Sequence, residues 1–107
     1  MTFYYPPAIG TSVVYCLARI PHDKIVDGKV GMQHVDARAG ITFGGFLAAI
    51  EWARTEARRE GENRYVLPCN VGYASNGGAV AHLVSGGNRI GVSPDGSCVP
   101  VPRFTSW

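Results

Sequence analysis

The sequence predicts an α+β fold in which one amphipathic helix packs on an antiparallel sheet of about five or six short strands. The helix is indicated by residues 44–60, where strong helix formers carry an apolar stripe. The sheet is indicated by the chain that follows, in which polar and apolar residues alternate in short segments separated by Gly and Pro. With 107 residues, the chain is long enough for a single globular domain spanning 1–107.

Composition narrows the class of protein further. Hydrophobic residues make up 46% and charged residues 17%, with a formal net charge of +2, which argues against a disordered or acidic solubilising chain. No stretch is long and apolar enough to span a membrane, and residues 1–7 lack the basic start and apolar core of a secretory signal. Three cysteines without a C-x-x-C spacing suit free thiols, so we expect a cytoplasmic protein.

Two strands are expected before the helix, after an extended arm that opens at Tyr5-Pro6-Pro7. Residues 12–20 are rich in β-branched and aromatic side chains and end at Pro21, which predicts a strand. Both faces of this strand are largely apolar, so we expect it to be covered on both sides. After a polar, turn-prone segment, residues 30–38 suit a second, weaker strand.

The helix is expected to run from Gly44 to Glu60, with Thr42 as its N-cap and Gly61 just past its end. Stepping about 100° per residue from Ile50 defines one apolar stripe. Its members are Phe46, Leu47, Ile50, Ala53 and Ala57. The basic residues near the end of the helix alternate with glutamates, which is typical of a solvated surface and argues against nucleic acid as a partner. They are Arg54, Arg58, Arg59 and Arg64.

Beyond the helix we expect a meander of about four antiparallel strands. The first spans 64–71, with Tyr65, Leu67, Cys69 and Val71 on one face. The next three span 78–85, 89–93 and 97–103, separated by turns at Asn76-Gly77, 86–88 and Pro94-Asp95-Gly96. Pro100 and Pro102 cannot donate to a ladder, so the last strand belongs at a sheet edge.

The entrance to the helix is the first candidate binding site. Residues 40–45 are rich in glycine but match neither a Walker A loop nor a dinucleotide-binding fingerprint. The first N–H groups of a helix lack intrahelical partners, and no acid lies in the first turn, so an anionic ligand could sit there. We predict ligand-binding roles for Arg38, Thr42, Phe43, Gly44, Gly45 and Tyr65. The alternative is that the two glycines only permit close packing of helix on sheet.

Candidate catalytic and metal-ligating residues are few. His34 and Asp36 would share one face of a strand, but two ligands do not make a zinc site, and a surface His–Asp pair explains them more simply. Cys69 and His82, on consecutive strands, form the only nucleophile–base pair, and a shift of one residue in register would separate them. We predict no metal and no cofactor.

Aromatic residues indicate self-association. Trp52 lies about 200° around the helix from Ile50, on the side away from the stripe, with Ala48, Thr55 and Arg59 beside it. Tryptophan and arginine are enriched at interface hot spots, so we predict a homodimer with Trp52 and Arg59 in its interface. Alternatively, a terminal arm, Phe3-Tyr4-Tyr5 or 104–107, covers Trp52 within one chain.

These observations predict a small non-enzymatic binding and assembly protein that self-associates and binds a small molecule or a protein partner. The missing catalytic set favours this class over an enzyme. The alternative is a small hydrolase or transferase that uses Cys69 and His82, with the helix N-terminus as its anion site.

Overall fold

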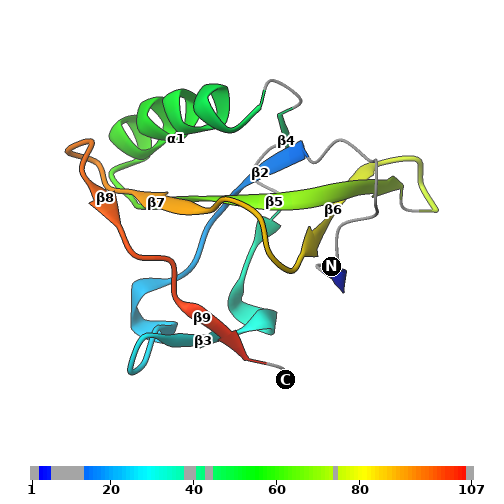
Figure 1. The fold of residues 1–107 in the computed structure, drawn as a ribbon, viewed down its shortest axis with the longest axis horizontal. Helices are drawn as coiled ribbons and strands as arrows, with labels where there is room; N and C mark the ends of the chain where they lie inside the picture. Colours follow the sequence, from blue (N-terminus) through cyan, green and yellow to red (C-terminus); the bar gives the residue numbers. More distant parts are fainter. Residues whose placement is uncertain (1–2, 6–13, 38–40, 43–44, 74, 106–107) are drawn as a thin grey trace.

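The computed structural model describes residues 3–5, 14–37, 41–42, 45–73 and 75–105. In this part of the chain one α-helix, α1 (Phe46–Glu60), lies on one face of a seven-stranded sheet. A second sheet of two strands lies on the opposite side (Figure 1). The predicted α+β class, with a helix packed on a largely antiparallel sheet, is confirmed.

The large sheet is built around one long central strand, β5. Its strands are β1 (Phe3–Tyr5), β2 (Val14–Ala18), β4 (Ile41–Thr42), β5 (Arg64–Tyr73), β6 (Ala79–Val84), β7 (Ile90–Val92) and β8 (Cys98–Val99). The order β1-β6-β5-β2-β4 is antiparallel except for the parallel pair of β1 and β6. β7 pairs with the first residues of β5, and β8 pairs with β7.

The predicted meander is therefore wrong in its order. β6 and β7 both pair with β5, at opposite ends of that ten-residue strand, rather than with each other. The turn between them contains Gly86 and Gly87, both at positive φ, and it carries the chain along β5 instead of closing a hairpin. The strand expected at 97–103 is divided at its prolines into β8 and β9 (Arg103–Thr105), which belong to different sheets.

The second sheet joins distant parts of the sequence. β3 (Lys29–Gly31) runs parallel to β9, with Val30 opposite Phe104. Two short 3-10 helices, η1 (His22–Lys24) and η2 (Met32–His34), flank β3 along the chain. The strand expected at 30–38 is thus mostly absent, because η2 interrupts it and only the bridge from Asp36 to Arg19 follows.

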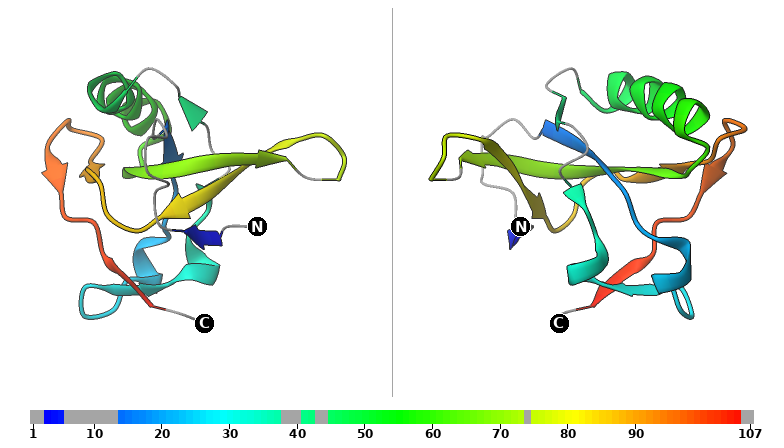
Figure 2. Two further views of the ribbon diagram at one scale, coloured as in Figure 1. Left: turned by 45° about the vertical axis from the view of Figure 1, so that its right-hand side comes forward. Right: turned by 180° about the vertical axis from the view of Figure 1, so that it is seen from behind.

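The large sheet has a hydrophobic cluster on each face. On the helix side, Tyr15 and Leu17 of β2 pack with α1, whereas Cys16 and Ala18 face the opposite cluster. The prediction that this strand is covered on both sides is confirmed. The opposite cluster is closed by the short elements, which contribute Val30, Met32 and other residues from the 20–37 segment (Figure 2).

The C-terminal end of the helix was predicted correctly, and its N-cap was not. α1 begins at Phe46, and Gly45 at φ 89° occupies the N-cap position, so Thr42 is not the cap; it lies in β4, opposite Tyr15. At the other end Gly61 is left-handed at φ 68°, as predicted, and the Gly61 N–H donates to the Ala57 carbonyl at 2.9 Å.

The apolar stripe is rotated from its predicted position. Ala49, Ala53 and Ala57 form a fully buried row against the sheet, with Ile50 on one side of this row. Leu47, expected in the stripe, is 78% exposed. Trp52, expected on the outer face, is half-buried and packs against the helix-side cluster. The other four predicted members, Phe46, Ile50, Ala53 and Ala57, are buried or packed in the helix-side cluster or against the sheet, as predicted. The alanine row is centred about 60° from Ile50 on the helical wheel, because small alanines mark the closest approach of helix to sheet.

The terminal aromatics are held within the chain where the structure describes them. β1 pairs its backbone with β6, and Phe104 packs against the cluster on the face away from α1. Trp107 lies outside the described residues. The described residues include no helix that combines the length and apolar character needed to cross a membrane.

Candidate functional site

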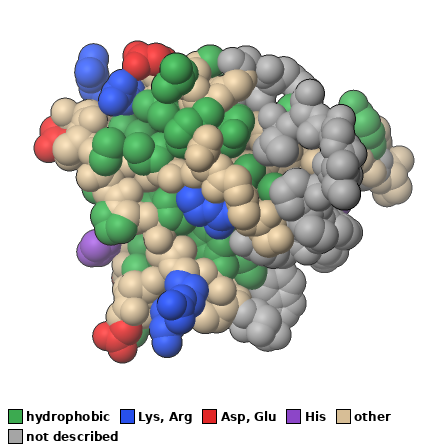
Figure 3. Space-filling view, viewed as in Figure 1, with side chains coloured by type: hydrophobic (Ala, Val, Ile, Leu, Met, Phe, Trp, Pro, Cys, Tyr) green, Lys and Arg blue, Asp and Glu red, His purple; other side chains and the backbone are tan. Residues whose placement is uncertain are grey.

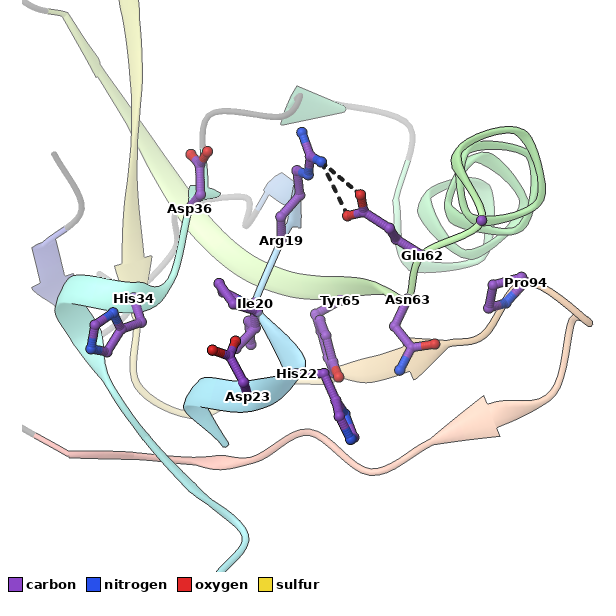
Figure 4. Close-up of a pocket in the computed structure, with 12 residues that line it drawn as sticks. Arg19, Ile20, His22, Asp23, His34, Asp36, Glu62, Asn63, Tyr65 and Pro94 are labelled. Carbon is purple, nitrogen blue, oxygen red and sulfur yellow. Dashed lines mark hydrogen bonds and ion pairs between the residues drawn. The ribbon is translucent and has the colours of Figure 1, made fainter. Parts of the chain in front are cut away.

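A cavity of about 870 Å³ opens between the end of β2, the two 3-10 helices and the turn that follows α1. Its lining residues come from four separate stretches of sequence, 19–23, 34–36, 61–65 and Pro94 (Figure 4). They are Arg19, Ile20, Pro21, His22, Asp23, His34, Asp36, Gly61, Glu62, Asn63, Tyr65 and Pro94. Its volume lies in the range typical of sites for small molecules.

Local sequence signals explain why these stretches meet here. Pro21 ends the extended chain of β2 and turns it into η1, which brings His22 and Asp23 to the rim. Gly61 adopts the left-handed conformation that ends α1, so Glu62 and Asn63 leave the helix toward the same rim. The pairing of Arg19 with Asp36, in which each backbone N–H donates to the other carbonyl at 2.8 and 2.9 Å, holds the third side.

An ion pair forms part of the rim. The Arg19 guanidinium donates through Nη2 to both Glu62 carboxylate oxygens, at 3.0 and 3.1 Å. This hydrogen bond, rather than burial, lowers the pKa of the Glu62 carboxyl below its ordinary value. Both side chains are about half exposed, so the pair adds little to stability and leaves this part of the rim free to rearrange around a ligand.

The charges that line the cavity are unequal. Three carboxylates, from Asp23, Asp36 and Glu62, and one guanidinium, from Arg19, are among the lining residues. Glu62 is paired with Arg19 and also lies 3.4 Å from Nη1 of Arg64. His22, Asn63 and the Tyr65 hydroxyl add further polar groups (Figure 4). The arrangement can therefore hold a polar molecule that carries a positive charge or several hydrogen-bond donors. Within the described part of the chain, no group of three or more His, Cys, Asp or Glu side chains is placed to hold a metal ion.

The structure describes three of the six ligand-binding residues predicted around the helix entrance: Thr42, Gly45 and Tyr65. Of these three, Tyr65 alone lines the cavity, and its ring is also part of the cluster on the face away from α1. Thr42 and Gly45 lie elsewhere, in β4 and at the start of α1. Arg38, Phe43 and Gly44 lie outside the described residues.

His34 and Asp36 both line the cavity but not as the predicted pair. The strand that would place them on one face is replaced by η2, which ends at His34. Their side chains point in different directions, with the carboxylate of Asp36 directed away from the imidazole of His34 (Figure 4). The surface His–Asp pair is therefore not formed.

The catalytic pair expected from Cys69 and His82 is also not formed. Leu83 lies opposite Cys69 in the ladder, and both side chains face the cluster away from α1. His82 lies opposite Asn70, and its imidazole covers Gly72, where an added Cβ would come within 2.1 Å of Nε2. Neighbouring residues of a strand face opposite ways, so His82 points away from the Cys69 thiol.

The nearest partner of Cys69 is instead another thiol. A hydrogen bond with Cys69, together with burial, raises the pKa of the Cys16 thiol well above its ordinary value. Both cysteines are fully buried, whereas Cys98 is exposed on β8.

The predicted interface residues lie on one flank of α1. The Arg59 guanidinium is paired with Glu56, one turn earlier, and with Glu60, its neighbour, at 3.2 Å. Trp52 contributes part of its ring to the helix-side cluster and leaves part exposed beside Ala48 and Thr55. Arg64, grouped with the helix surface from its charge pattern, is only 4% exposed and lies in β5.

Sequence reasoning missed most of this cavity. His22, Asp23 and Asn63 carry no motif and have no regular spacing, since the cavity is made by the meeting of segments up to 75 residues apart, from Arg19 to Pro94. The sequence signals that point toward the cavity are Pro21, which ends a strand, and Gly61, which ends the helix. Fold and cavity together define a small α+β domain with an open site at the junction of its turns, lined by both charged and apolar residues. No family model, curated protein or solved structure matches the chain.

Proposed function

We propose that the chain is a non-enzymatic binding module that holds a small molecule in the cavity at the end of β2 and associates with a second copy of itself. The observation that carries this proposal is the cavity, whose volume of about 870 Å³ and mixed polar lining suit a ligand. Its rim is built from turns and an exposed ion pair, which can adjust to a bound molecule.

The charge of the lining supports a particular class of ligand. With three carboxylates against one guanidinium, a cationic organic molecule such as an amine or a guanidine is favoured over an anion. This differs from the anionic ligand expected at the helix entrance, a site whose central residues the structure does not describe.

The ligand proposal is tested by nuclear magnetic resonance titration with matched small amines and carboxylates. We expect saturable shifts at His22, Asn63 and Tyr65 with the amines alone. Asp23→Asn should weaken amine binding about threefold to tenfold, because it removes one exposed carboxylate from the rim. Asp27→Asn is the matched control, because Asp27 lies outside the cavity lining, and its φ of 53° suits asparagine. Equal binding of carboxylates, or an equal loss in both variants, would contradict the proposal.

Self-association is supported by the flank of α1. The exposed part of Trp52 lies between the exposed residues Ala48 and Thr55, which are small enough to let a partner approach the indole. Arg59 continues this flank by one turn. A two-fold dimer in which the two flanks face each other would bury the remaining surface of both indoles.

The test of self-association is the solution mass from low to high micromolar concentration. We expect a concentration-dependent dimer that is lost in Ala48→Lys, which places a charge beside Trp52 without removing core packing. Ser75→Lys, on the turn between β5 and β6, makes the same addition of charge far from the helix and should dimerise like the parent. A parent that stays monomeric throughout would refute this part of the proposal.

The enzyme alternative finds less support. A hydrolase or transferase that used Cys69 would need a thiol that reagents can reach, whereas this thiol is fully buried and faces away from His82. We expect a thiol reagent to modify Cys98 rapidly and Cys69 only at the rate of unfolding. Rapid modification of Cys69 in the folded protein would restore the enzyme hypothesis.

Surface charge supports a protein or small-molecule partner rather than nucleic acid. On the part of the face that Figure 3 describes, Lys and Arg side chains lie in a few separate places among hydrophobic and neutral groups and form no continuous basic stripe. A module of this composition, with three free cysteines, suits the reducing cytoplasm.

A further inference from the structure

The turn that joins β5 and β6 holds a motif that the proposed function leaves unused. Asn76 is followed by Gly77 and Gly78, and all three residues are exposed. The turn lies away from α1 and from the second sheet (Figure 2). None of the three residues lines the cavity at the end of β2. Chemistry at this turn is therefore separate from both the proposed ligand site and the proposed dimer.

The side chain of Asn76 is tied back onto the backbone that follows it. Its Oδ1 accepts a hydrogen bond from the Gly78 N–H at 2.9 Å, a contact that asparagine commonly makes two residues along a turn. A bond from Asn76 Cγ to the Gly77 nitrogen would close a five-membered ring within the stretch of backbone that this hydrogen bond spans. Gly77 has no side chain, and nothing lies within 4 Å of the position that a Cβ would take, so its nitrogen is open to this approach.

The same hydrogen bond stabilises the charge that ring closure creates. When the Gly77 nitrogen attacks Cγ, negative charge develops on Oδ1, as it does on the oxygen of any carbonyl under nucleophilic attack. The Gly78 N–H already donates to this atom, at a distance that suits a donor to a developing oxyanion. The attacking and attacked groups belong to neighbouring residues, so the reaction needs no encounter with a second molecule.

The other three asparagines of the chain do not combine these features. Asn63 and Asn70 are followed by arginine and valine, whose side chains hinder approach to the backbone nitrogen, and Asn70 also lies within the ladder of β5. Asn88 is the nearest match, since it is exposed and lies in the glycine-containing turn after β6. It precedes Arg89, however, whose side chain hinders the nitrogen in the same way. Sequence and structure together therefore single out Asn76.

We propose that Asn76 is a site of spontaneous deamidation, in which the Gly77 nitrogen displaces the side-chain amide nitrogen and the Gly78 N–H stabilises the displacement. The Gly77 nitrogen gives its proton to water and bonds to Cγ; the Cγ–Nδ2 bond then breaks, and the amide nitrogen leaves as ammonia after taking a proton from water. Water next opens the succinimide ring. Attack at Cγ leaves an aspartyl linkage, whereas attack at the main-chain carbonyl carbon breaks the original peptide bond and leaves an isoaspartyl linkage. Overall, one water is consumed, one ammonia is released, and the turn gains a carboxylate.

A pair of substitutions at Gly78 tests the contribution of the hydrogen bond. Gly78→Pro removes the N–H that donates to Oδ1, whereas Gly78→Ala keeps this donor. Both variants place a Cβ about 3.2 Å from Oδ1, and Gly78 is not at positive φ, so they differ chiefly in the donor. We expect deamidation to be about threefold to tenfold slower in Gly78→Pro than in Gly78→Ala, with thermal unfolding as the check that both fold. Equal rates in the two variants would overturn the role assigned to the Gly78 N–H.

Peptide mapping by mass spectrometry, during incubation of the full chain at neutral pH, tests the site itself. We expect the mass increase for replacement of NH₂ by OH at position 76 about tenfold faster than at Asn88, with isoaspartate as part of the product. This mass increase distinguishes the site from the Asp-Gly pairs at 27–28 and 95–96, where isomerisation leaves the mass unchanged. Asn76→Gln should remove the signal, and Asn88→Gln, the matched control, should leave it unchanged. Equal rates at the two asparagines, or aspartate formed without isoaspartate, would overturn the proposal.

Discussion

The two faces of the large sheet are covered in different ways. On one face a single fifteen-residue helix presses a row of alanines against the sheet, and the adjoining side chains close the layer. On the other face two 3-10 helices and a two-stranded sheet, each element three residues long, cover a cluster that is the larger of the two among the described residues. The cavity at the end of β2 lies where these short elements meet the turn that follows α1.

This difference shows how a small domain can combine a face covered by one continuous helix with a face that leaves room for a ligand. A helix satisfies its own backbone hydrogen bonds and presents a continuous surface, so it seals a sheet without gaps. Short irregular segments end in turns whose backbone groups face the rim, and the spaces between them remain open. Both sides bury apolar side chains, and the side away from α1 holds the larger cluster and also carries the cavity at the end of β2.

The largest expected effect on stability tests how α1 packs against the sheet. Ile50→Asp should unfold the domain, with a loss of roughly 3–5 kcal/mol, because it places an unpaired charge in the cluster around Leu17 and Val66. Leu47→Asp, the same type of change in the same helix, should alter stability by less than about 0.5 kcal/mol because Leu47 is exposed. Urea unfolding measures both. Similar losses in the two variants would mean that the helix packs through a different stripe.

A pair of cavity-forming substitutions compares the two faces directly. Leu17 and Leu67 lie on neighbouring strands and are each 1% exposed, but Leu17 faces α1 and Leu67 faces the short elements. Leu17→Ala should cost about 4 kcal/mol and Leu67→Ala about 2–3 kcal/mol, because loosely connected segments can collapse into the space more readily than a helix can. Equal losses measured by denaturant unfolding would show that the two faces are equally rigid.

Much of the helix side could be predicted from the sequence. The run of helix formers ending at Gly61, and the strand that is apolar on both faces, follow from local periodicity and backbone preference. The rotation of the stripe did not follow, because alanine carries little hydrophobic signal even where it marks the closest contact. The position of Trp52 was misjudged for the same reason.

The side of the sheet away from α1 could not be predicted in the same way. Which strands pair with β5, and at which end, depends on contacts that sequence periodicity does not encode. The cavity at the end of β2 depends on those pairings, since Arg19, His34, Glu62 and Pro94 approach one another only after the sheet is formed. Of the predicted ligand-binding residues that the structure describes, Tyr65 lines this cavity, whereas Thr42 and Gly45 do not.

A smaller effect is expected at Gly61, where the two sides join. Gly61→Val should cost about 1–2 kcal/mol, because φ is 68° there and a β-branched residue resists that conformation. Nothing lies within 4 Å of an added Cβ, so the loss comes from the backbone alone. Gly61→Asn should therefore recover most of it, since asparagine tolerates left-handed φ. Thermal unfolding that shows equal losses would point to a steric cause instead.

The smallest effect concerns the turn between β7 and β8, which carries Pro94 to the rim of the cavity at the end of β2. The Asp95 carboxylate accepts hydrogen bonds from the Ser93 hydroxyl, from the Ser97 hydroxyl at 2.6 Å and from the Ser97 N–H at 2.9 Å. These bonds favour the charged form and hold the pKa of Asp95 at about 2. Because the pKa is lowered on folding, the contribution to stability is present above the ordinary value near 3.9 and is lost as pH falls through about 2.

A nuclear magnetic resonance titration of the Asp95 carboxyl carbon should measure its lowered pKa directly. Ser93→Ala removes the donor with the largest influence and should raise the pKa of Asp95 more than Ser97→Ala, which leaves the Ser97 N–H in place. Ser85→Ala, outside the turn, is the control and should leave the pKa unchanged. Because Asp95 is fully exposed, unfolding at neutral pH should barely change in either variant. A titration midpoint of Asp95 that is the same in Ser93→Ala as in the parent would show that the turn does not hold the carboxylate, and that Pro94 reaches the rim without this network.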